Sequence, residues 1–227
     1  MLTKLIHLAL AVAWTAVIFY DLFIMKYPRG PPTRLANLAW RFRFLTVWNM
    51  VLHCIYFYVS FAGDICPVVC GDKKKKCWLL SVRDNLFTAV VYPTSLFIPV
   101  AFWSLFMINR ELIYPKELDA IVPLWLNHFL HSFIGVFVLL EAMIVHHEYP
   151  SLVKGFLQVA IFDMSYLMWT FWLRYYTNEW VYPVFQALSP IGLILFIVVS
   201  LTVSFFFYWL GRALHILRWT SSGTKQD

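Results

Sequence analysis

Charged side chains are scarce in this sequence. Asp, Glu, Lys and Arg make up 13% of its 227 residues, whereas soluble domains carry roughly 25%. The chain also lacks Gly/Ser linkers, low-complexity blocks and internal repeats other than Tyr-Pro pairs. Instead, 61% of the residues are apolar and 19% are aromatic, and the mean hydropathy is +0.70. The composition excludes an ordinary soluble domain and indicates a single polytopic membrane domain.

Motifs of several well-known enzyme classes are also absent. There is no GxSxG nucleophile elbow, no HExxH zinc motif and no glycine-rich phosphate loop, and we expect no cofactor. Only four cysteines are present, and Cys66, Cys70 and Cys77 lie close together with spacings that match no common zinc pattern. If their loop is cytoplasmic these thiols are reduced, so we expect no structural disulfide.

The apolar runs are long enough to cross a bilayer six times, at about 20 residues for each crossing. Each span must be helical, because lipid cannot satisfy the backbone groups that an open structure exposes. The predicted fold is therefore all-α, a bundle of six transmembrane helices formed by residues 1–227. Pro93 and Pro99 should kink the third helix. The expected spans are 5–25, 43–63, 85–108, 124–145, 155–175 and 190–210.

The net charge of +6 comes from basic residues in loops that flank the spans. These residues are typical of anchors to the lipid headgroups, so we expect contacts with membrane lipids and no nucleic-acid partner. With an even number of spans, both termini lie on one side of the membrane. That side carries ten Lys and Arg residues and the other side eight, which favours cytoplasmic termini.

Polar side chains inside apolar spans are costly, so each of them is a candidate functional group. On a helix, residues three, four and seven apart share a face. The second and fourth expected spans each carry a polar stripe of this kind. Two stripes that face one another can share hydrogen bonds and water, which predicts a polar pocket between these spans. The stripes are Thr46, Asn49 and His53 on the second span, and Asn127, His128 and His131 on the fourth.

A hydroxyl group beside an imidazole suits nucleophilic acyl transfer, because the hydroxyl is a weak nucleophile until a base takes its proton. Thr46 is the candidate nucleophile. His131 is the candidate base, since imidazole titrates near neutral pH. A neighbouring polar group would orient the base or stabilise an oxyanion. The candidates for such a supporting role are Asn127, His128, Asn49 and His53.

Other interpretations of these polar residues stay open on residue type alone. The HxxH spacing at 128–131 suits a metal ion, but His146 and His147 follow about 15 residues later, or about 22 Å along a helix. We therefore expect no metal site. In a transporter, Asp163, Glu141 and the histidines would form a proton relay, although no pair of corresponding broken helices is visible. In a non-catalytic scaffold, the polar stripes would only join helices.

Six segments, which run in order and span nearly all of the chain, resemble the androgen-induced protein family of membrane threonine hydrolases. Each segment alone is a weak signal, whereas together they are specific. The segments are WRFRFLTVWN at 40–49, RDNLFTAVVYP at 83–93, AFWSLFMINRELIYPK at 101–116, VPLWLNHFLHSF at 122–133, HHEYPS at 146–151 and WVYPVF at 180–185.

This resemblance implies a six-helix membrane hydrolase that cleaves fatty acid esters of hydroxy fatty acids. The family threonine falls on Thr46, within the segment at 40–49, and the family histidine is the second one of WLNHxxH and falls on His131. The implied substrate is a lipid ester, and the implied location is the endoplasmic reticulum or the plasma membrane. Nothing in the sequence fixes an oligomeric state.

Overall fold

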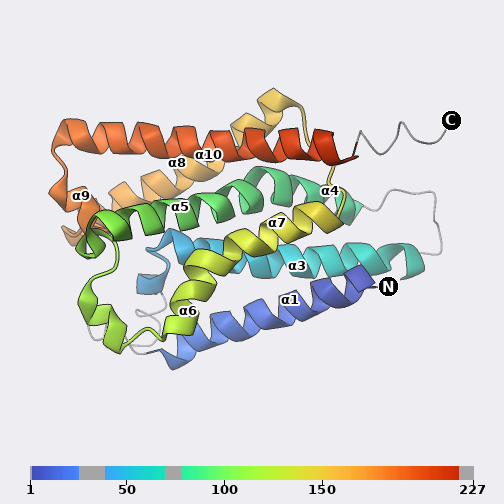
Figure 1. The fold of residues 1–227 in the computed structure, drawn as a ribbon, viewed down its shortest axis with the longest axis horizontal. Helices are drawn as coiled ribbons and strands as arrows, with labels where there is room; N and C mark the ends of the chain where they lie inside the picture. The colour runs from blue at the N-terminus through green and yellow to red at the C-terminus, as the bar shows by residue number, and fades with distance from the viewer. Residues whose placement is uncertain (1, 26–38, 70–77, 220–227) are drawn as a thin grey trace.

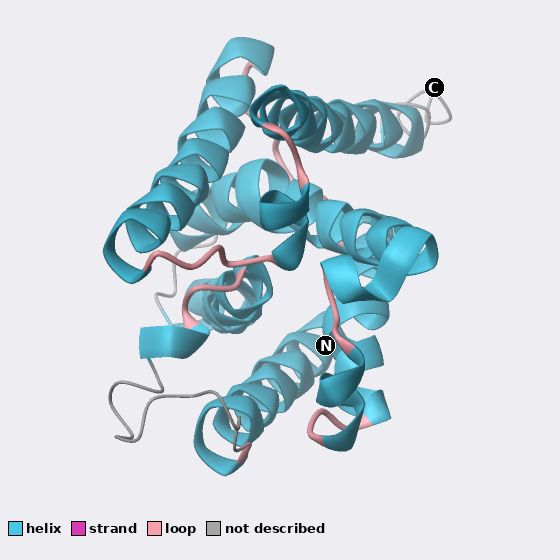
Figure 2. Ribbon diagram, turned by 90° about the vertical axis from the view of Figure 1, so that its left-hand side faces the viewer, coloured by secondary structure: helices cyan, strands magenta, loops and turns pink. Residues whose placement is uncertain are grey.

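The computed structural model describes residues 2–25, 39–69 and 78–219. Within these ranges every regular element is a helix and no strand is present (Figure 2). The predicted all-α bundle of six membrane helices is confirmed, because six helical segments of the described chain are long and apolar enough to cross a bilayer. They are 2–24, 45–66, 78–112, 124–144, 152–177 and 190–219.

Three of these spans are built from several helical elements. The first span joins α1 (Leu2–Phe19) to the π-turn η1 (Tyr20–Ile24). The second span, by contrast, is the single helix α3 (Leu45–Val69). The third comprises α4 (Trp78–Leu86), the π-turn η2 (Phe87–Val91), α5 (Tyr92–Asn109) and the 3-10 turn η3 (Arg110–Leu112). The fourth comprises α6 (Leu124–His128), the π-turn η5 (Phe129–Phe133) and α7 (Ile134–Ile144). The last two are α8 (Leu152–Thr177) and α10 (Pro190–Trp219), while η4 (Lys116–Ala120) and α9 (Pro183–Ala187) lie in connections.

Several helices extend beyond the predicted spans. The third begins at residue 78 rather than 85, and α10 continues to residue 219 rather than 210. The added turns contain charged side chains, which an apolar window leaves out. These charges have partners in the fold: Arg83 donates to Asp84 at 2.7 Å, and Arg212 donates to the Pro150 carbonyl. Apolar length therefore reports the hydrocarbon crossing and not the whole helix.

Pro93 disturbs the third span in a specific way. Proline has no backbone N–H, and its ring clashes with the carbonyl four residues earlier in a regular α-helix. The π-turn η2 ends two residues before Pro93, and its wider turn accommodates the ring. The chain then continues as α5, with Pro99 inside the helix. The expected distortion at Pro93 is a π-turn and does not break the span.

The helix α5 lies in the middle of the bundle, where it packs against both α10 and α7. The helix α1 packs along α3, and α8 packs along α10. Figure 1 shows α10 and α1 on opposite faces of the bundle, with α5 and α3 between them. The helix α1 begins and α10 ends at the same end of the bundle (Figure 1), as an even number of crossings requires.

Glycine allows close packing between α8 and α10. A Cβ atom at Gly155 would overlap the hydroxyl group of Tyr208, whose side chain is fully buried. We expect Gly155→Ala to lower the free energy of unfolding by roughly 1–3 kcal/mol, because the ring or the helix must move. Gly135→Ala is the matched control, since its nearest neighbour would lie 3.5 Å away. Thermal unfolding in detergent micelles measures both, and equal melting temperatures would contradict the prediction.

A set of buried hydrogen bonds joins helices near the end of the bundle where α1 begins. His7 of α1 lies 2.8 Å from Asp64 Oδ2 of α3 and 3.0 Å from Glu141 Oε1 of α7. The same Glu141 oxygen accepts a hydrogen bond from the hydroxyl group of Tyr56. His7, Tyr56 and Glu141 are each 1% exposed or less. These contacts tie the first, second and fourth spans together.

The set continues through the segment that follows α7. The Tyr56 hydroxyl lies 3.4 Å from His147 Nε2, and His147 Nδ1 lies 3.0 Å from Asp84 Oδ1 of α4. Burial lowers the pKa of His147, while its hydrogen bond to Asp84 acts in the opposite direction. Asp84 also accepts a hydrogen bond from Arg83. We call these residues the termini-side cluster: His7, Tyr56, Asp64, Arg83, Asp84, Glu141 and His147.

The cysteine-rich connection after α3 differs from expectation. Cys66 is disulfide-bonded, and its partner lies outside the described residues, as do Cys70, Cys77 and the lysine run at 73–76. The prediction that this loop contains no structural disulfide is therefore wrong. Thiol spacing alone does not report the redox state, because that state depends on the compartment that the loop faces.

Candidate active site

The start of α3 is held by side chains that bond its preceding carbonyl groups. The Phe42 carbonyl accepts hydrogen bonds from Trp48 Nε1 at 2.7 Å and from Trp169 Nε1 at 3.0 Å. The Arg43 carbonyl accepts one from the Tyr166 hydroxyl at 2.9 Å. Such carbonyls normally pair with the first amides of a helix. Here they tie the first turn of α3 to α8 instead.

This attachment also sets where the second span begins relative to α8. From Tyr166, α8 continues for eleven residues to Thr177, which is about 16 Å at 1.5 Å per residue. The first turn of α3 thus begins well below the end of α8. A hydroxyl on that turn lies within the bundle, at a depth that residues in the middle of the fourth span can reach.

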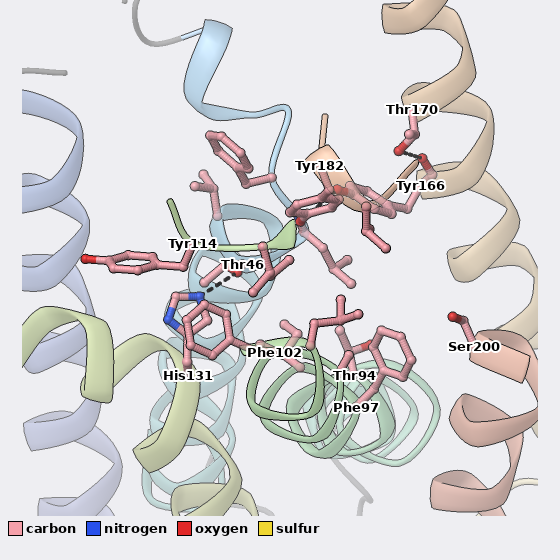
Figure 3. Close-up of a pocket in the computed structure, with 18 of the residues that line it drawn as sticks. Thr46, Thr94, Phe97, Phe102, Tyr114, His131, Tyr166, Thr170, Tyr182 and Ser200 are labelled. Carbon is pink, nitrogen blue, oxygen red and sulfur yellow. Dashed lines mark hydrogen bonds between the residues drawn. The ribbon is translucent and has the colours of Figure 1, made fainter. Parts of the chain in front are cut away.

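Thr46 and His131 meet in this region. Thr46 Oγ1, in the first turn of α3, lies 3.4 Å from His131 Nε2 in the π-turn η5 (Figure 3). A π-turn adds a residue to a helical turn, and such bulges are frequent at functional sites. The separation is slightly longer than the 2.6–3.2 Å of a tight catalytic hydrogen bond, as is common in unliganded sites. The two side chains come from separate spans.

Asn127 determines which nitrogen of His131 faces Thr46. His131 Nδ1 lies 3.0 Å from the backbone oxygen of Asn127 and 2.8 Å from its side-chain Oδ1. A backbone carbonyl can only accept, so Nδ1 must carry the proton and donate. In the neutral ring Nε2 then has the lone pair, and the hydroxyl of Thr46 donates to it. This is the arrangement of a nucleophile and its general base.

Two aromatic residues of α5 fix the histidine further. The Phe102 ring stacks on the imidazole, with a centroid distance of 3.8 Å and an interplanar angle of 12°. Trp103 Nε1 donates to the His131 carbonyl at 2.9 Å, which helps to satisfy the loosened backbone of the π-turn. Figure 3 shows the Phe102 ring against the imidazole, beside Thr46. The His131 ring is therefore covered on one face by Phe102, and its backbone is held by Trp103.

The backbone at Thr46 offers a hydrogen-bond donor to the same site. The N–H groups of the first helical turn have no partner within the helix. The Leu45 N–H donates to the Tyr182 hydroxyl at 3.1 Å, and the Phe42 carbonyl is already bonded by two indoles. The Thr46 N–H therefore stands at the positive end of the 25-residue helix α3. A negative oxygen formed at the Thr46 side chain would be stabilised there.

The pair opens into a largely apolar cavity of about 260 Å³. Its walls come from α3, α5, α8, α10, η5 and the connections at 113–122 and 182–185. Figure 3 shows Thr46 and His131 on one side of the cavity, with Ser200 of α10 and Thr170 of α8 across from them. Burial raises the pKa of Tyr114 to about 12, so this lining phenol stays neutral. The space suits the reacting part of a lipid.

Two candidate supporting residues of the second span do not join this site. Asn49 Oδ1 accepts a hydrogen bond from Ser95 of α5 at 3.2 Å, and His53 Nε2 lies 2.7 Å from the same hydroxyl. His53 also stacks on Trp14 with centroids 4.4 Å apart. The prediction that these residues face the fourth span is wrong, because α5 occupies the space beside them. They join the second span to the third.

His128 also points away from the pair. Its Nδ1 lies 3.2 Å from the Ser132 hydroxyl, and its ring stacks on Trp103. The metal-site alternative would join the HxxH pair at 128–131 to His146 and His147. His146 lies against His215, with ring centroids 4.8 Å apart, and His147 belongs to the termini-side cluster. The HxxH pair and these two histidines therefore do not converge on one position.

The contributions of α5, α8 and α10 to the site are not apparent from the sequence. Phe102 lies in an unbroken apolar run, so no periodicity distinguishes it from a lipid-facing residue. Asp163 is recognisable as an ionisable residue within a span, but its place on the cavity wall follows only from the packing of α8. These residues reach the site from segments far apart in the chain.

Fold and site together define a class, an integral membrane protein of six helices whose internal cavity contains a threonine–histidine pair. More particularly, the chain belongs to the FAR-17a/AIG1-like protein family, whose model matches residues 3–216. The resemblance inferred from the sequence is thereby confirmed.

Named relatives agree with this membership. Human androgen-dependent TFPI-regulating protein is 37% identical over 210 residues, which cover 92% of this chain and 90% of that protein. Human androgen-induced gene 1 protein is 29% identical over 191 residues, covering 82% and 80%. A UPF0641 membrane protein of Schizosaccharomyces pombe is 24% identical over 179 residues, covering 77% and 74%. No solved structure matches the chain.

Proposed function

We propose that this protein is an intramembrane hydrolase of lipid esters, with Thr46 as nucleophile and His131 as general base. The observation that carries the proposal is the contact of 3.4 Å between Thr46 Oγ1 and His131 Nε2, with Nδ1 held by Asn127. Asn127 is a positioning residue in this scheme. No cofactor is needed, since the hydroxyl, the imidazole and water supply all reacting groups.

The proposed reaction proceeds in two halves. In the first, Thr46 Oγ1 attacks the ester carbonyl carbon while its proton passes to His131 Nε2. The resulting oxyanion is stabilised by the Thr46 N–H at the start of α3. The carbon–oxygen bond to the alcohol then breaks, and His131 protonates the departing alkoxide. In the second half, water loses a proton to His131 and attacks the acyl-threonine, which releases the fatty acid and restores the hydroxyl of Thr46.

The chemistry and the location of the cavity favour a lipid substrate. Apolar walls between membrane helices suit acyl chains, which can enter from the bilayer without crossing water. Fatty acid esters of hydroxy fatty acids are the proposed substrates, in line with the resemblance described for the sequence.

A transporter and a scaffold are the competing functions. A proton relay would require Asp163 and Glu141 to belong to one path. Glu141 lies in the termini-side cluster and Asp163 lines the cavity. No chain of hydrogen bonds between described residues connects the two. The hydrogen bonds of His131 favour a catalytic site over a proton path. Nδ1 donates to Asn127, which leaves Nε2 free to accept from Thr46.

Cleavage of an ester by the purified protein tests whether the protein is an enzyme, a transporter or a scaffold. Protein in lipid nanodiscs should convert a fatty acid ester of a hydroxy fatty acid into its acid and its hydroxy acid, measured by mass spectrometry. A transporter would move the ester into sealed proteoliposomes without cleaving it, and a scaffold would do neither. Intact ester after prolonged incubation would remove the enzyme proposal.

We also propose an integral location in the endoplasmic reticulum or the plasma membrane, with cytoplasmic termini. The orientation rests on ten basic residues on the termini side against eight on the other. The Cys66 disulfide opposes it, because disulfides persist in oxidising compartments and this loop lies on the same side as the termini.

An epitope tag at the N-terminus decides the orientation. In cells permeabilised with digitonin, which opens the plasma membrane only, an antibody should reach a cytoplasmic tag. A C-terminal tag on the same protein provides the control for an even number of spans. Labelling that requires detergent treatment of all membranes, or that occurs on intact cells, would reverse the proposed orientation and agree with the disulfide.

A further inference from the structure

Asp163 is an ionisable residue on the cavity wall that the proposed reaction does not use. It lies near the middle of α8, eleven residues after Leu152. Its side chain lines the same cavity as Thr46 and His131. Figure 3 shows that α8 and α10 form the wall across from this pair. A substrate chain that leaves the ester toward these helices would pass this residue.

Asp163 is incompletely satisfied by the protein. Its Oδ2 atom is buried and has no hydrogen-bond partner among the described residues. The polar group that interacts with the carboxyl is Ser204 of α10, which is 4% exposed. A carboxyl group within the hydrocarbon is costly without partners and is least costly as the neutral acid. Its position therefore calls for a further hydrogen-bonding group in the cavity.

Neighbouring hydroxyl groups do not supply that partner. Ser200 donates to the Phe196 carbonyl at 2.8 Å, and Thr170 donates to the Tyr166 carbonyl at 3.0 Å. Both are typical bonds of a hydroxyl to its own helix, and they use the only proton of each group. Asp163 and Ser204 are thus left as the polar pair of this wall that can bind a ligand group.

We propose that Asp163 and Ser204 form a subsite for an O–H group, a carboxyl or a hydroxyl, on the substrate chain remote from the ester. This inference rests on the proposed function and specifies its substrate class. A neutral O–H group both donates and accepts, so it complements a carboxyl and a serine hydroxyl together. A plain hydrocarbon tail would leave the Asp163 oxygen without a partner. The subsite therefore selects esters whose alcohol half has a second polar group.

Uncleavable analogues test this selection by binding alone. Three ether analogues have an identical first chain. Their second chain ends in a carboxyl group in one analogue, a hydroxyl group in another and a methyl group in the third. Tryptophan fluorescence in nanodiscs reports their affinities. We expect the protein to bind the two polar-ended ethers about tenfold more tightly than the methyl-ended one, equivalent to about 1.4 kcal/mol. Comparison of the carboxyl and hydroxyl arms shows which group the subsite prefers.

Variants assign any such preference to the subsite. Asp163→Leu should remove the preference, while Asp163→Asn should keep part of it, because an amide also donates and accepts. Ser204→Ala removes only a hydroxyl and should weaken the preference, so the test does not depend on the leucine variant folding. Ser165→Ala is the matched control on α8, since this hydroxyl bonds the Ile161 carbonyl at 2.6 Å.

The outcomes separate this inference from the proposed hydrolysis. An equal affinity of the protein for all three ethers would overturn the subsite, and so would a preference that persists unchanged in Asp163→Leu and Ser204→Ala. Because ethers are not cleaved, binding is measured whether or not the protein hydrolyses esters. A protein that cleaves esters but ignores the polar end retains the proposed function and loses the subsite.

Discussion

Thr46→Ala is expected to lower the rate of ester cleavage by at least about a thousandfold, the scale seen when a catalytic nucleophile is removed. Without the hydroxyl no acyl intermediate can form. A fluorophosphonate probe, which reacts with activated hydroxyl groups, should label the protein and fail to label this variant. His131→Ala should have a similar effect on both measurements, because Thr46 then has no base at 3.4 Å.

Two further variants make this result specific. Thr46→Ser keeps a hydroxyl and should retain part of the labelling. Thr15→Ala is the matched control, since Thr15 lies on α1 and bonds the Ala11 carbonyl at 2.8 Å, and it should behave as the unchanged protein. Undiminished cleavage in Thr46→Ala, with correct folding and membrane insertion, would eliminate this threonine as the nucleophile.

Glu141→Ala is expected to cause the largest loss of stability among single substitutions in the termini-side cluster. The carboxylate accepts from Tyr56 and pairs with His7 at 3.0 Å, and it is 1% exposed. Removing one partner of such a buried set costs about 3–5 kcal/mol, because the others remain buried and unpaired. A melting temperature lower by roughly 10 °C in detergent follows from this magnitude.

The matched control is an exposed ion pair on the other side of the bundle. Arg110 donates to Asp119 at 2.6 Å, where the Asp119 side chain is 56% exposed. Asp119→Ala should therefore cost less than about 1 kcal/mol. Glu141→Gln should fall between the two, since the amide oxygen still accepts one hydrogen bond. If Glu141→Ala and Asp119→Ala have the same melting temperature, the termini-side cluster does not stabilise the fold.

Apolar run lengths were sufficient to predict the six spans, because a bilayer requires a set length of apolar helix whatever the helix contacts. They were insufficient for the helix ends. The turns that contain Arg83 and Arg212 are too polar for a hydropathy window, yet they are helical, and each guanidinium group bonds a carbonyl of another segment, that of His146 or that of Pro150. Such partners are invisible in a one-dimensional pattern.

The polar stripe that the sequence predicts on the second span is divided in the structure. Thr46 contacts the fourth span, whereas Asn49 and His53 contact Ser95 of the third. Helical periodicity states which residues share a face. It does not state which neighbouring helix covers each part of that face, since this depends on the depth and tilt of the helices.

The sequence by itself determined the membrane class and the number of crossings and, through its resemblance, it indicated the family and the candidate pair Thr46 and His131. Tertiary structure alone decided that α8 fixes the first turn of α3 deep in the bundle, that Phe102 covers the imidazole, and that Asp163 lines the same cavity. The physical reason is that local energetics fix the state of each segment, while a cavity exists only where several packed segments leave space between them.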